Sequence, residues 1–171
     1  MNLIHVLARR RVALGFVTAL ATIVLAHPTW GSWRAGFVVA LVGEAVRIWA
    51  AGHLEKSREV TRSGPYRWMS HPLYVGSTII ALGIVIAARS VSVGALAALY
   101  MAATLTAAVR TEEAFLRRAF GDDYERYRAS RAEPMPRHFS LARAIRNREH
   151  RSAAGLLAGF ALLALKVVGS L

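Results

Sequence analysis

The sequence contains no cysteine among its 171 residues. The chain therefore forms no disulfide, offers no thiolate to a metal ion and has no thiol nucleophile. Acidic residues are also scarce, because 10 Asp and Glu stand against 22 Lys and Arg and leave a formal net charge of +12. The chain has no internal repeat, and no alternating apolar and polar stretch is long enough to predict a β-sheet.

Hydrophobic residues make up 55% of the chain, and the mean hydropathy is +0.37. In a soluble protein this hydropathy conflicts with so large a positive charge. The two agree when apolar segments lie in lipid and basic residues lie in the loops. A basic chain is also typical of nucleic-acid binding, but the long uncharged runs argue against that class. We therefore expect an integral membrane protein with the lipid bilayer, and no nucleic acid, as its partner.

Five apolar runs predict one domain over residues 1–171, an all-α integral membrane bundle of five transmembrane helices with a cytoplasmic cap of helices and loops. The first run also fits a signal peptide, with a basic start and a cleavage-like Val24-x-Ala26. We favour a retained helix that extends toward Trp30, because Pro28 and several more apolar runs follow. The expected spans are 12–30, 35–54, 73–88, 90–109 and 152–171.

The basic residues predict the orientation of this bundle. The N-terminal segment, the loop after the second span and the segment 110–151 hold 18 of the 22 Lys and Arg residues. The two loops on the opposite side carry only Arg34 and Arg89. The positive-inside rule places the N-terminus in the cytoplasm and the C-terminus outside, across the plasma membrane if the source is a bacterium. The polar segments 55–72 and 110–151 then share the cytoplasmic side.

Two charged residues, Glu44 and Arg47, lie within the second apolar run. A charge at mid-bilayer costs about 2.5–3.5 kcal/mol on insertion scales, so such residues usually face the bundle interior and pair. Their i, i+3 spacing puts them on one helix face, and we favour a structural ion pair over a direct role in a site. Gly76 and Gly83 also share a face, which fits either close helix packing or a passage for a lipid chain.

The stretch Ser63–Gly76, read S-G-P-Y-R-W-M-S-H-P-L-Y-V-G, gathers hydrogen-bonding and stacking groups at the expected membrane surface. Gly64 and Pro65 predict a turn. Pro72 suits the first turn of a helix and disfavours helical backbone at the preceding residue, so His71 is expected just outside that helix. An ordinary interfacial belt of aromatic and polar residues is the simpler interpretation of each residue taken singly.

A second polar segment begins at Arg110 and carries the adjacent acids Glu112 and Glu113. The third and fourth spans are joined by few residues, so we expect them to form an antiparallel hairpin. The hairpin would bring His71 and Tyr74 close to the second polar segment. Solvated carboxylates are the simpler interpretation of each acid alone, and only the convergence of the two segments suggests a site.

Two motifs occur in order: G-P-Y-R-x-x-x-H-P-x-Y-x-G, ending at Gly76, and E-E-x-x-L-x-x-x-F-G-x-x-Y-x-x-Y, from Glu112 to Tyr127. Together they resemble the isoprenylcysteine carboxyl methyltransferase family, part of a wider group that includes phospholipid N-methyltransferases. The resemblance runs from about Arg47 to Pro136. It implies a membrane methyltransferase that uses S-adenosylmethionine, held at the cytoplasmic ends of the later helices, and a lipidic or small-molecule methyl acceptor.

The resemblance also implies roles for individual residues. Glu113 would hold the ribose hydroxyls or the sulfonium side of the cofactor, and Arg110 would orient an anionic group, so these two are the expected catalytic residues. No metal ligand is expected. The family has Arg where this chain has Ser70, and Arg67 or Arg110 are the candidates to replace that charge. The expected cofactor-binding residues are Tyr66, His71, Pro72, Tyr74, Gly76, Glu112, Glu113, Tyr124 and Tyr127.

Several functions stay open at this stage. The acceptor is an isoprenylcysteine-like carboxylate, a phospholipid amine or a small thiol or acid. An NADPH-dependent reductase of the sterol-reductase type ends with a similar H-P-x-Y-x-G element, although such chains are larger. A membrane protein that keeps the architecture without catalysis is the third alternative.

Overall fold

The computed structural model describes residues 3–169, with side chains from Leu14 onward. Within that range the chain is all-α, as the sequence predicts, and it contains no β-strand. The basic side chains expected to mark the N-terminal segment, at positions 9–11, lie outside the described side chains. The elements are α1 (Leu3–Leu25), α2 (Trp30–His53), the 3₁₀ turn η1 (Gly64–Arg67), α3 (Pro72–Ala88), α4 (Val91–Arg128), α5 (Leu141–Arg146) and α6 (Glu149–Val168).

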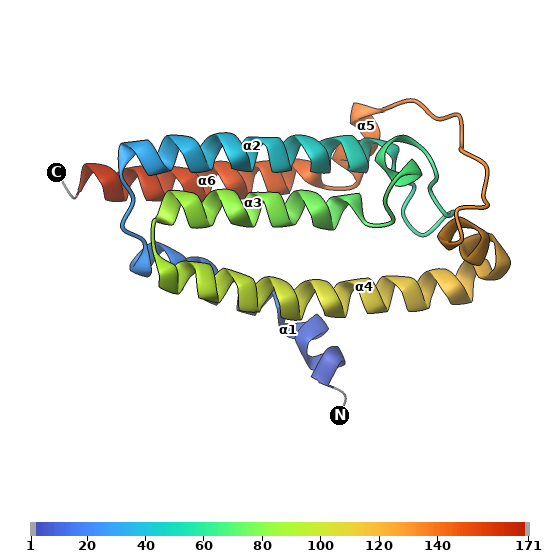
Figure 1. Cartoon of the computed structure of the whole chain (residues 1–171), viewed down its shortest axis with the longest axis horizontal. Coiled ribbons are helices and arrows are strands. Elements are labelled where there is room, and N and C mark those ends of the chain that lie inside the picture. The colour runs from blue at the N-terminus through green and yellow to red at the C-terminus, as the bar shows by residue number, and fades with distance from the viewer. Residues whose placement is uncertain (1–2, 170–171) are drawn as a thin grey trace.

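Helices α2, α3 and α6 lie side by side, and α4 runs along one side of this group (Figure 1). Successive long helices alternate in direction, so the end of α2, the start of α3 and the start of α6 meet at one end of the bundle with α5. Helix α2 contacts α3 over most of its length, whereas α3 and α4 touch far less and α1 packs mainly against α4. The predicted hairpin of α3 and α4 is present, but it is an open one.

Glycines let α2 and α3 approach until their backbones touch. A Cβ atom added to Gly43 would lie 2.7 Å from the carbonyl oxygen of Gly76, and one added to Gly83 would lie 2.5 Å from that of Gly36. These separations are too short for any carbon–oxygen contact, so only residues without a side chain fit. Of the two interpretations of Gly76 and Gly83, close helix packing is therefore the one that the structure supports.

An apolar core fills the end of the bundle that lies away from the polar loops. Trp33 stacks on Phe37 with 5.0 Å between ring centroids, and its Nε1 donates to the carbonyl oxygen of Phe160 at 2.8 Å. These contacts tie α2 to α6, because the indole both buries its rings and satisfies its donor. The buried members of this core are Ala26, Ala40, Ala87, Ala88, Val93, Leu156, Phe160 and Leu163.

The first predicted span extends too far. Helix α1 ends at Leu25 and α2 begins at Trp30, since Pro28 between them offers no backbone N–H to continue a helix. Thr29 caps α2: its hydroxyl accepts from the Ser32 N–H at 3.2 Å, and the Ser32 hydroxyl accepts from the Thr29 N–H at 3.0 Å. This reciprocal pair is a capping box, and it assigns Trp30 to the second helix.

Three helices of the described chain, α2, α4 and α6, are long and apolar enough to cross a membrane. The described apolar part of α1 and the whole of α3 are shorter, so the count of five spans stays a prediction. Helix α4 outruns the predicted range 90–109 and continues to Arg128, with a break at Gly121 where φ is +43°. Its polar part is rich in good helix formers, which explains why the helix does not stop at the end of the apolar run.

Ion pairs and hydrogen bonds fasten the polar cap to the end of α2. The Arg137 guanidinium forms a bidentate pair with Glu59, and Arg143 Nε donates to Glu55 at 2.8 Å. Asn147 Nδ2 donates to two backbone carbonyl oxygens near the end of α2, both at 2.9 Å. The two polar segments that the sequence singles out therefore lie at the same end of the bundle.

Candidate functional site

A cavity of about 610 Å³ opens at the polar end of the bundle. This volume lies in the range of about 300–1,000 Å³ that ligand pockets occupy. Its walls come from the end of α2, the loop 54–61, the residues on either side of the start of α3, the middle of α4 and the start of α6. Leu73, Ala107 and Leu116 are among the apolar residues of the lining. The charged or ionisable residues of the lining, tyrosines aside, are Arg47, Lys56, Glu59, His71, Glu112 and Glu149.

His71 lies between two adjacent carboxylates of α4. Its Nδ1 is 3.5 Å from Glu112 Oε2, and its Nε2 is 3.6 Å from Glu113 Oε1. Pro72 opens α3, and His71 precedes it outside the helix with φ −132° and ψ 58°, as the sequence predicts. The imidazole also stacks on the ring of Tyr74, with 5.5 Å between centroids. The first turn of α3 therefore meets the acidic turn of α4.

The two acids change the protonation of His71. The Glu112 carboxylate beside the ring raises the pKa of His71, and burial of the ring opposes this effect. Separations of 3.5 and 3.6 Å are at or beyond the limit of a hydrogen bond, so both contacts are better described as ion-pair contacts. Among the described residues nothing else satisfies the two ring nitrogens. The largely buried imidazole is flanked by carboxylates, and neither of its ring nitrogens makes a hydrogen bond within the described part of the chain.

Tyr127 stands at the far end of the cavity wall on α4. Its hydroxyl donates to the carbonyl oxygen of Tyr66 at 2.8 Å and to that of Met69 at 3.3 Å, which holds the turn η1 against α4. Burial raises the pKa of both Tyr66 and Tyr127, so both hydroxyls stay protonated at neutral pH. Tyr124 is buried with its ring 6.4 Å from that of Tyr127, and it does not line the cavity.

Glu113 faces His71 but is not part of the cavity lining, and two further predicted site residues support the site rather than line it. Pro72 is buried at the start of α3, where it sets the position of His71. Gly76 faces α2, and a Cβ atom there would lie 2.6 Å from Cγ of Arg47. Neither belongs to the cavity wall. Their positions suit a structural task more than contact with a ligand.

The arginines singled out from the sequence lie elsewhere. Arg110 is exposed, does not line the cavity and forms no ion pair within residues 14–169. Glu113, its expected i, i+3 partner, instead lies 3.9 Å from Arg117. Arg67 is exposed and is also absent from the lining. Neither candidate replacement for the charge missing at Ser70 therefore reaches the cavity.

Glu149 is not among the residues predicted from the sequence, yet it forms an ion pair with Arg47 that joins α6 to α2 within the cavity lining. Its carboxylate accepts from Arg47 Nε at 3.1 Å and from Arg47 Nη2 at 2.9 Å. The predicted Glu44–Arg47 pair is also present but longer, at 3.9 Å, and Glu44 accepts a hydrogen bond from Ser152 at 3.0 Å. The only sequence signal for Glu149 was an acid at the start of an apolar run, and nothing local relates it to a residue 102 positions away.

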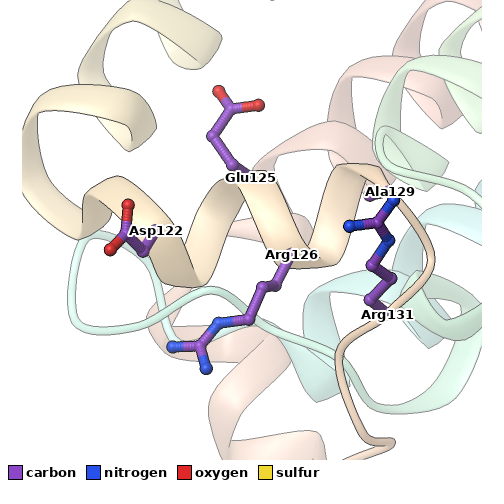
Figure 2. A pocket seen from close by; sticks show the side chains of 5 residues that line it. All are labelled: Asp122, Glu125, Arg126, Ala129 and Arg131. Atoms are coloured by element: carbon purple, nitrogen blue, oxygen red, sulfur yellow. The ribbon is translucent and has the colours of Figure 1, made fainter.

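A second hollow, of about 520 Å³, lies on the outer surface of α4 near its end. Figure 2 shows Glu125 and Arg126 pointing to opposite sides of the helix, with Asp122 apart from both. The lining side chains therefore do not converge on a common point. This hollow therefore lacks a set of side chains that could hold a ligand together. The cavity beside His71 is the candidate functional site.

The chemistry of the cavity wall suits an organic ligand with charged and aromatic parts. Carboxylates accept hydrogen bonds from hydroxyl or ammonium groups, and Tyr66, Tyr74 and Phe115 offer aromatic surface. Within the part of the chain whose side chains are described, no three His, Asp or Glu side chains are arranged to hold a metal ion.

Residues 25–123 match the family model described as phospholipid methyltransferase. The cobalt-zinc-cadmium resistance protein CzcN of Cupriavidus metallidurans is 34% identical over 119 residues, which cover 64% of this chain and 54% of that protein. The nickel-cobalt-cadmium resistance protein NccN of Alcaligenes xylosoxydans xylosoxydans is 31% identical over 137 residues, which cover 70% of this chain and 63% of that protein. The chain thus spans less than two thirds of the length of both curated relatives. No solved structure matches it.

The matched residues include α2, α3 and the part of α4 that carries Glu112 and Glu113, and they end before Tyr124 and Tyr127. They therefore contain the contact between His71 and the two acids. Because the match covers more than half of the sequence, the chain belongs to the phospholipid methyltransferase family, which includes the isoprenylcysteine carboxyl methyltransferase-like membrane enzymes.

Proposed function

We propose that the protein is an S-adenosylmethionine-dependent methyltransferase that acts at the boundary between membrane and cytosol. The observation that carries this proposal is the position of His71 between Glu112 and Glu113, beside a cavity whose lining contains both polar and apolar side chains. Family membership supports the reaction class. The cavity supports it further, because it has the size and the polar groups that such a ligand needs.

The residues present fit S-adenosylmethionine in three respects. The carboxylates of Glu112 and Glu113 suit its ribose hydroxyls or its cationic groups. Tyr66 and Tyr74 offer ring faces to a purine or a sulfonium. The ring nitrogens of His71, without a close hydrogen-bond partner among the described residues, have capacity for a ligand. When bound, the cofactor supplies an electrophilic methyl group.

The chain's own residues contribute positioning and the exclusion of water. Transfer to a carboxylate acceptor needs little acid–base help, so alignment of the two reactants in a dry site dominates. Leu73 and Leu116 add apolar surface to the cavity lining, and the Tyr127 hydroxyl holds η1 against α4. An amine acceptor must lose a proton, and Glu113 or His71 is then the base. The catalytic role of Arg110 stays a prediction without support from the cavity geometry.

For the acceptor we propose a lipidic molecule or a small carboxylate, as in isoprenylcysteine carboxyl methylation, with a phospholipid amine or a small thiol as the alternative. The lining from Thr104 to Ala108 belongs to the apolar run of α4, which supports access from the bilayer. The names of CzcN and NccN refer to metal resistance, but we do not propose metal binding for this chain on that ground. The chain lacks cysteine, and its described side chains form no metal-holding cluster.

We further propose the topology expected from the sequence, with five spans, the N-terminus in the cytoplasm and the cavity facing the cytosol. The native chain has no cysteine, so single introduced thiols report without background. We expect a membrane-impermeant maleimide to label Arg34→Cys and to leave Ser130→Cys unlabelled in intact cells. Labelling of Ser130→Cys alone would show that the protein has the opposite orientation in the membrane.

The reaction itself is tested by incubating membranes that contain the protein with methyl-labelled S-adenosylmethionine. We expect label in the lipid or small-molecule fraction, and its release by mild base identifies an ester, whereas base-stable label identifies an amine or thioether. Glu113→Ala should lose the labelling, and Glu125→Ala, on the outer surface of α4, should keep it. Labelling no greater than in membranes without the protein would contradict the proposal.

A further inference from the structure

We infer that Lys56 is the anion-binding residue of this cavity and that it holds a carboxylate or phosphate group of the ligand. The inference rests on the proposed function, because it concerns the ligand of the same site. It adds a residue and a chemical class that the sequence motifs do not contain, since Lys56 lies in the loop between α2 and η1.

The charges of the cavity wall lead to this residue. Each of the other five charged or ionisable side chains of the lining, tyrosines aside, lies within ion-pair distance of an acidic or basic partner, either within the lining or just behind it. Lys56 forms no ion pair and no side-chain hydrogen bond within the described part of the chain. Lys56 is therefore the one of these six side chains without an ion-pair partner in the described part of the chain. The three pairs are Arg47 with Glu149, His71 with Glu112 and Glu59 with Arg137.

Lys56 is placed by a fixed stretch of backbone. Its neighbour Glu55 is tied to Arg143 at 2.8 Å, and the Glu55 N–H donates to the hydroxyl of Thr61 at 3.3 Å. The loop is thus closed on itself and fastened to the cap. From it the Lys56 side chain is exposed but borders the cavity, with a flexible four-carbon stem that can follow a ligand.

The Glu112 carboxylate interacts with Lys56 but does not form an ion pair with it. The charge of Lys56 acts on the Glu112 carboxylate, but Glu112 already faces the imidazole of His71 at 3.5 Å. A lysine near a cavity mouth with no carboxylate of its own raises the local concentration of anions and orients them as they enter. An anionic group of the ligand would be the ion-pair partner of Lys56.

The other cations at this end of the bundle are less suited. Arg47 lines the cavity, but it is committed to Glu149 through two hydrogen bonds. Drawing it onto a ligand would leave the buried Glu149 carboxylate unpaired, which is strongly unfavourable. Arg67 and Arg110 are outside the wall. The anion comes either from the amino-acid end of S-adenosylmethionine or from the methyl acceptor, and binding data separate these sources.

The test compares Lys56→Gln, the conservative Lys56→Arg and the matched control Arg58→Gln, an exposed loop arginine outside the lining. Calorimetry on purified full-length protein in detergent measures the Kd of S-adenosylmethionine and of its decarboxylated analogue. We expect Lys56→Gln to weaken S-adenosylmethionine about tenfold, the order of one charge-assisted hydrogen bond. Lys56→Arg and Arg58→Gln should bind as the wild type does. The decarboxylated analogue should bind wild type and Lys56→Gln equally.

A second outcome also supports the inference: unchanged affinity of Lys56→Gln for the cofactor with a KM for the acceptor raised about tenfold assigns the anion to the acceptor. Equal behaviour of Lys56→Gln and wild type in both measurements would overturn it, as would equal weakening of S-adenosylmethionine and its decarboxylated analogue. Failure of the proposed function gives a different result, in which the wild type itself binds neither compound, and the inference then falls with it.

Discussion

Helix α3 has two sides that pack in opposite ways. Toward α2 the backbones touch, and a Cβ atom on Gly43 or Gly83 would fall within 2.7 Å of the facing helix. Toward α4 the contacts are sparse, and a cavity of about 610 Å³ is left at the polar end. On the side facing α2 there is no space for an added Cβ atom at these glycines, whereas on the side facing α4 part of the space is unfilled. The first builds a rigid frame, and the second leaves room for a ligand.

The contrast gives His71 its position. Pro72 fixes the start of α3, and the tight contact with α2 fixes the whole helix, so the imidazole is held at the mouth of the open side. Residues at the α2–α3 contact should therefore govern stability. Residues at the cavity should govern binding with much smaller effects on stability. Variants on the two sides test that division.

The largest effect is expected at the tight side. Gly76→Leu places a side chain against the carbonyl oxygen of Gly43 and against Arg47, and the helices must move apart. We expect a loss of about 3 kcal/mol or more, measured by thermal unfolding in detergent. Gly159→Leu is the matched control, because no atom lies within 4 Å of a Cβ atom there. Equal stability of the two variants would contradict the claim that the α2–α3 contact is too close for a side chain at Gly76.

The next effect concerns Arg47, which contacts α3 at Gly76 and also forms an ion pair with Glu149 in the cavity wall. Arg47→Leu leaves the carboxylate of Glu149, which is 6% exposed, without its guanidinium. We expect a loss of about 3 kcal/mol on removal of one partner of a buried pair, measured by the same unfolding experiment. The double variant Arg47→Leu/Glu149→Leu should recover most of that loss. A double variant as unstable as Arg47→Leu would show that packing, not charge, is responsible.

A smaller effect is expected in the protonation of His71. Glu112 raises the pKa of His71, so Glu112→Gln should lower it, as followed by NMR of labelled histidine. Because the folded-state pKa lies above the ordinary value of 6.5, the stability from this contact is full below pH 6.5. It is lost as the pH rises through the raised folded-state value. An unchanged His71 pKa in Glu112→Gln would contradict the contact.

Much of this arrangement follows from local rules. Gly64 with φ +55° and Pro65 form the predicted turn, and Pro72 opens a helix as its fixed φ requires. The short link between α3 and α4 makes the two helices antiparallel, which places His71 at the same end of the hairpin as the paired acids. These features depend on a few neighbouring residues, so they can be predicted from the sequence.

What escaped prediction depends on distant packing. The phase of α4 is set by its contacts with α1 and α3, and it turns Arg110 to the surface while Glu113 points to His71. The i, i+3 spacing alone does not reveal this. The pairing of Arg47 with Glu149 depends on α6 returning beside α2, which no local pattern encodes.

The central claim is that the open side of α3 binds S-adenosylmethionine through His71 and Glu113. Calorimetric titration of the detergent-purified wild type, His71→Ala and Glu113→Ala, with NADPH as the competing ligand class, tests it most directly. We predict that the wild type binds S-adenosylmethionine and not NADPH, and that both variants lose this binding while their thermal unfolding stays within about 1 kcal/mol of wild type. Wild-type affinity in both variants, or binding of NADPH alone, would contradict the claim.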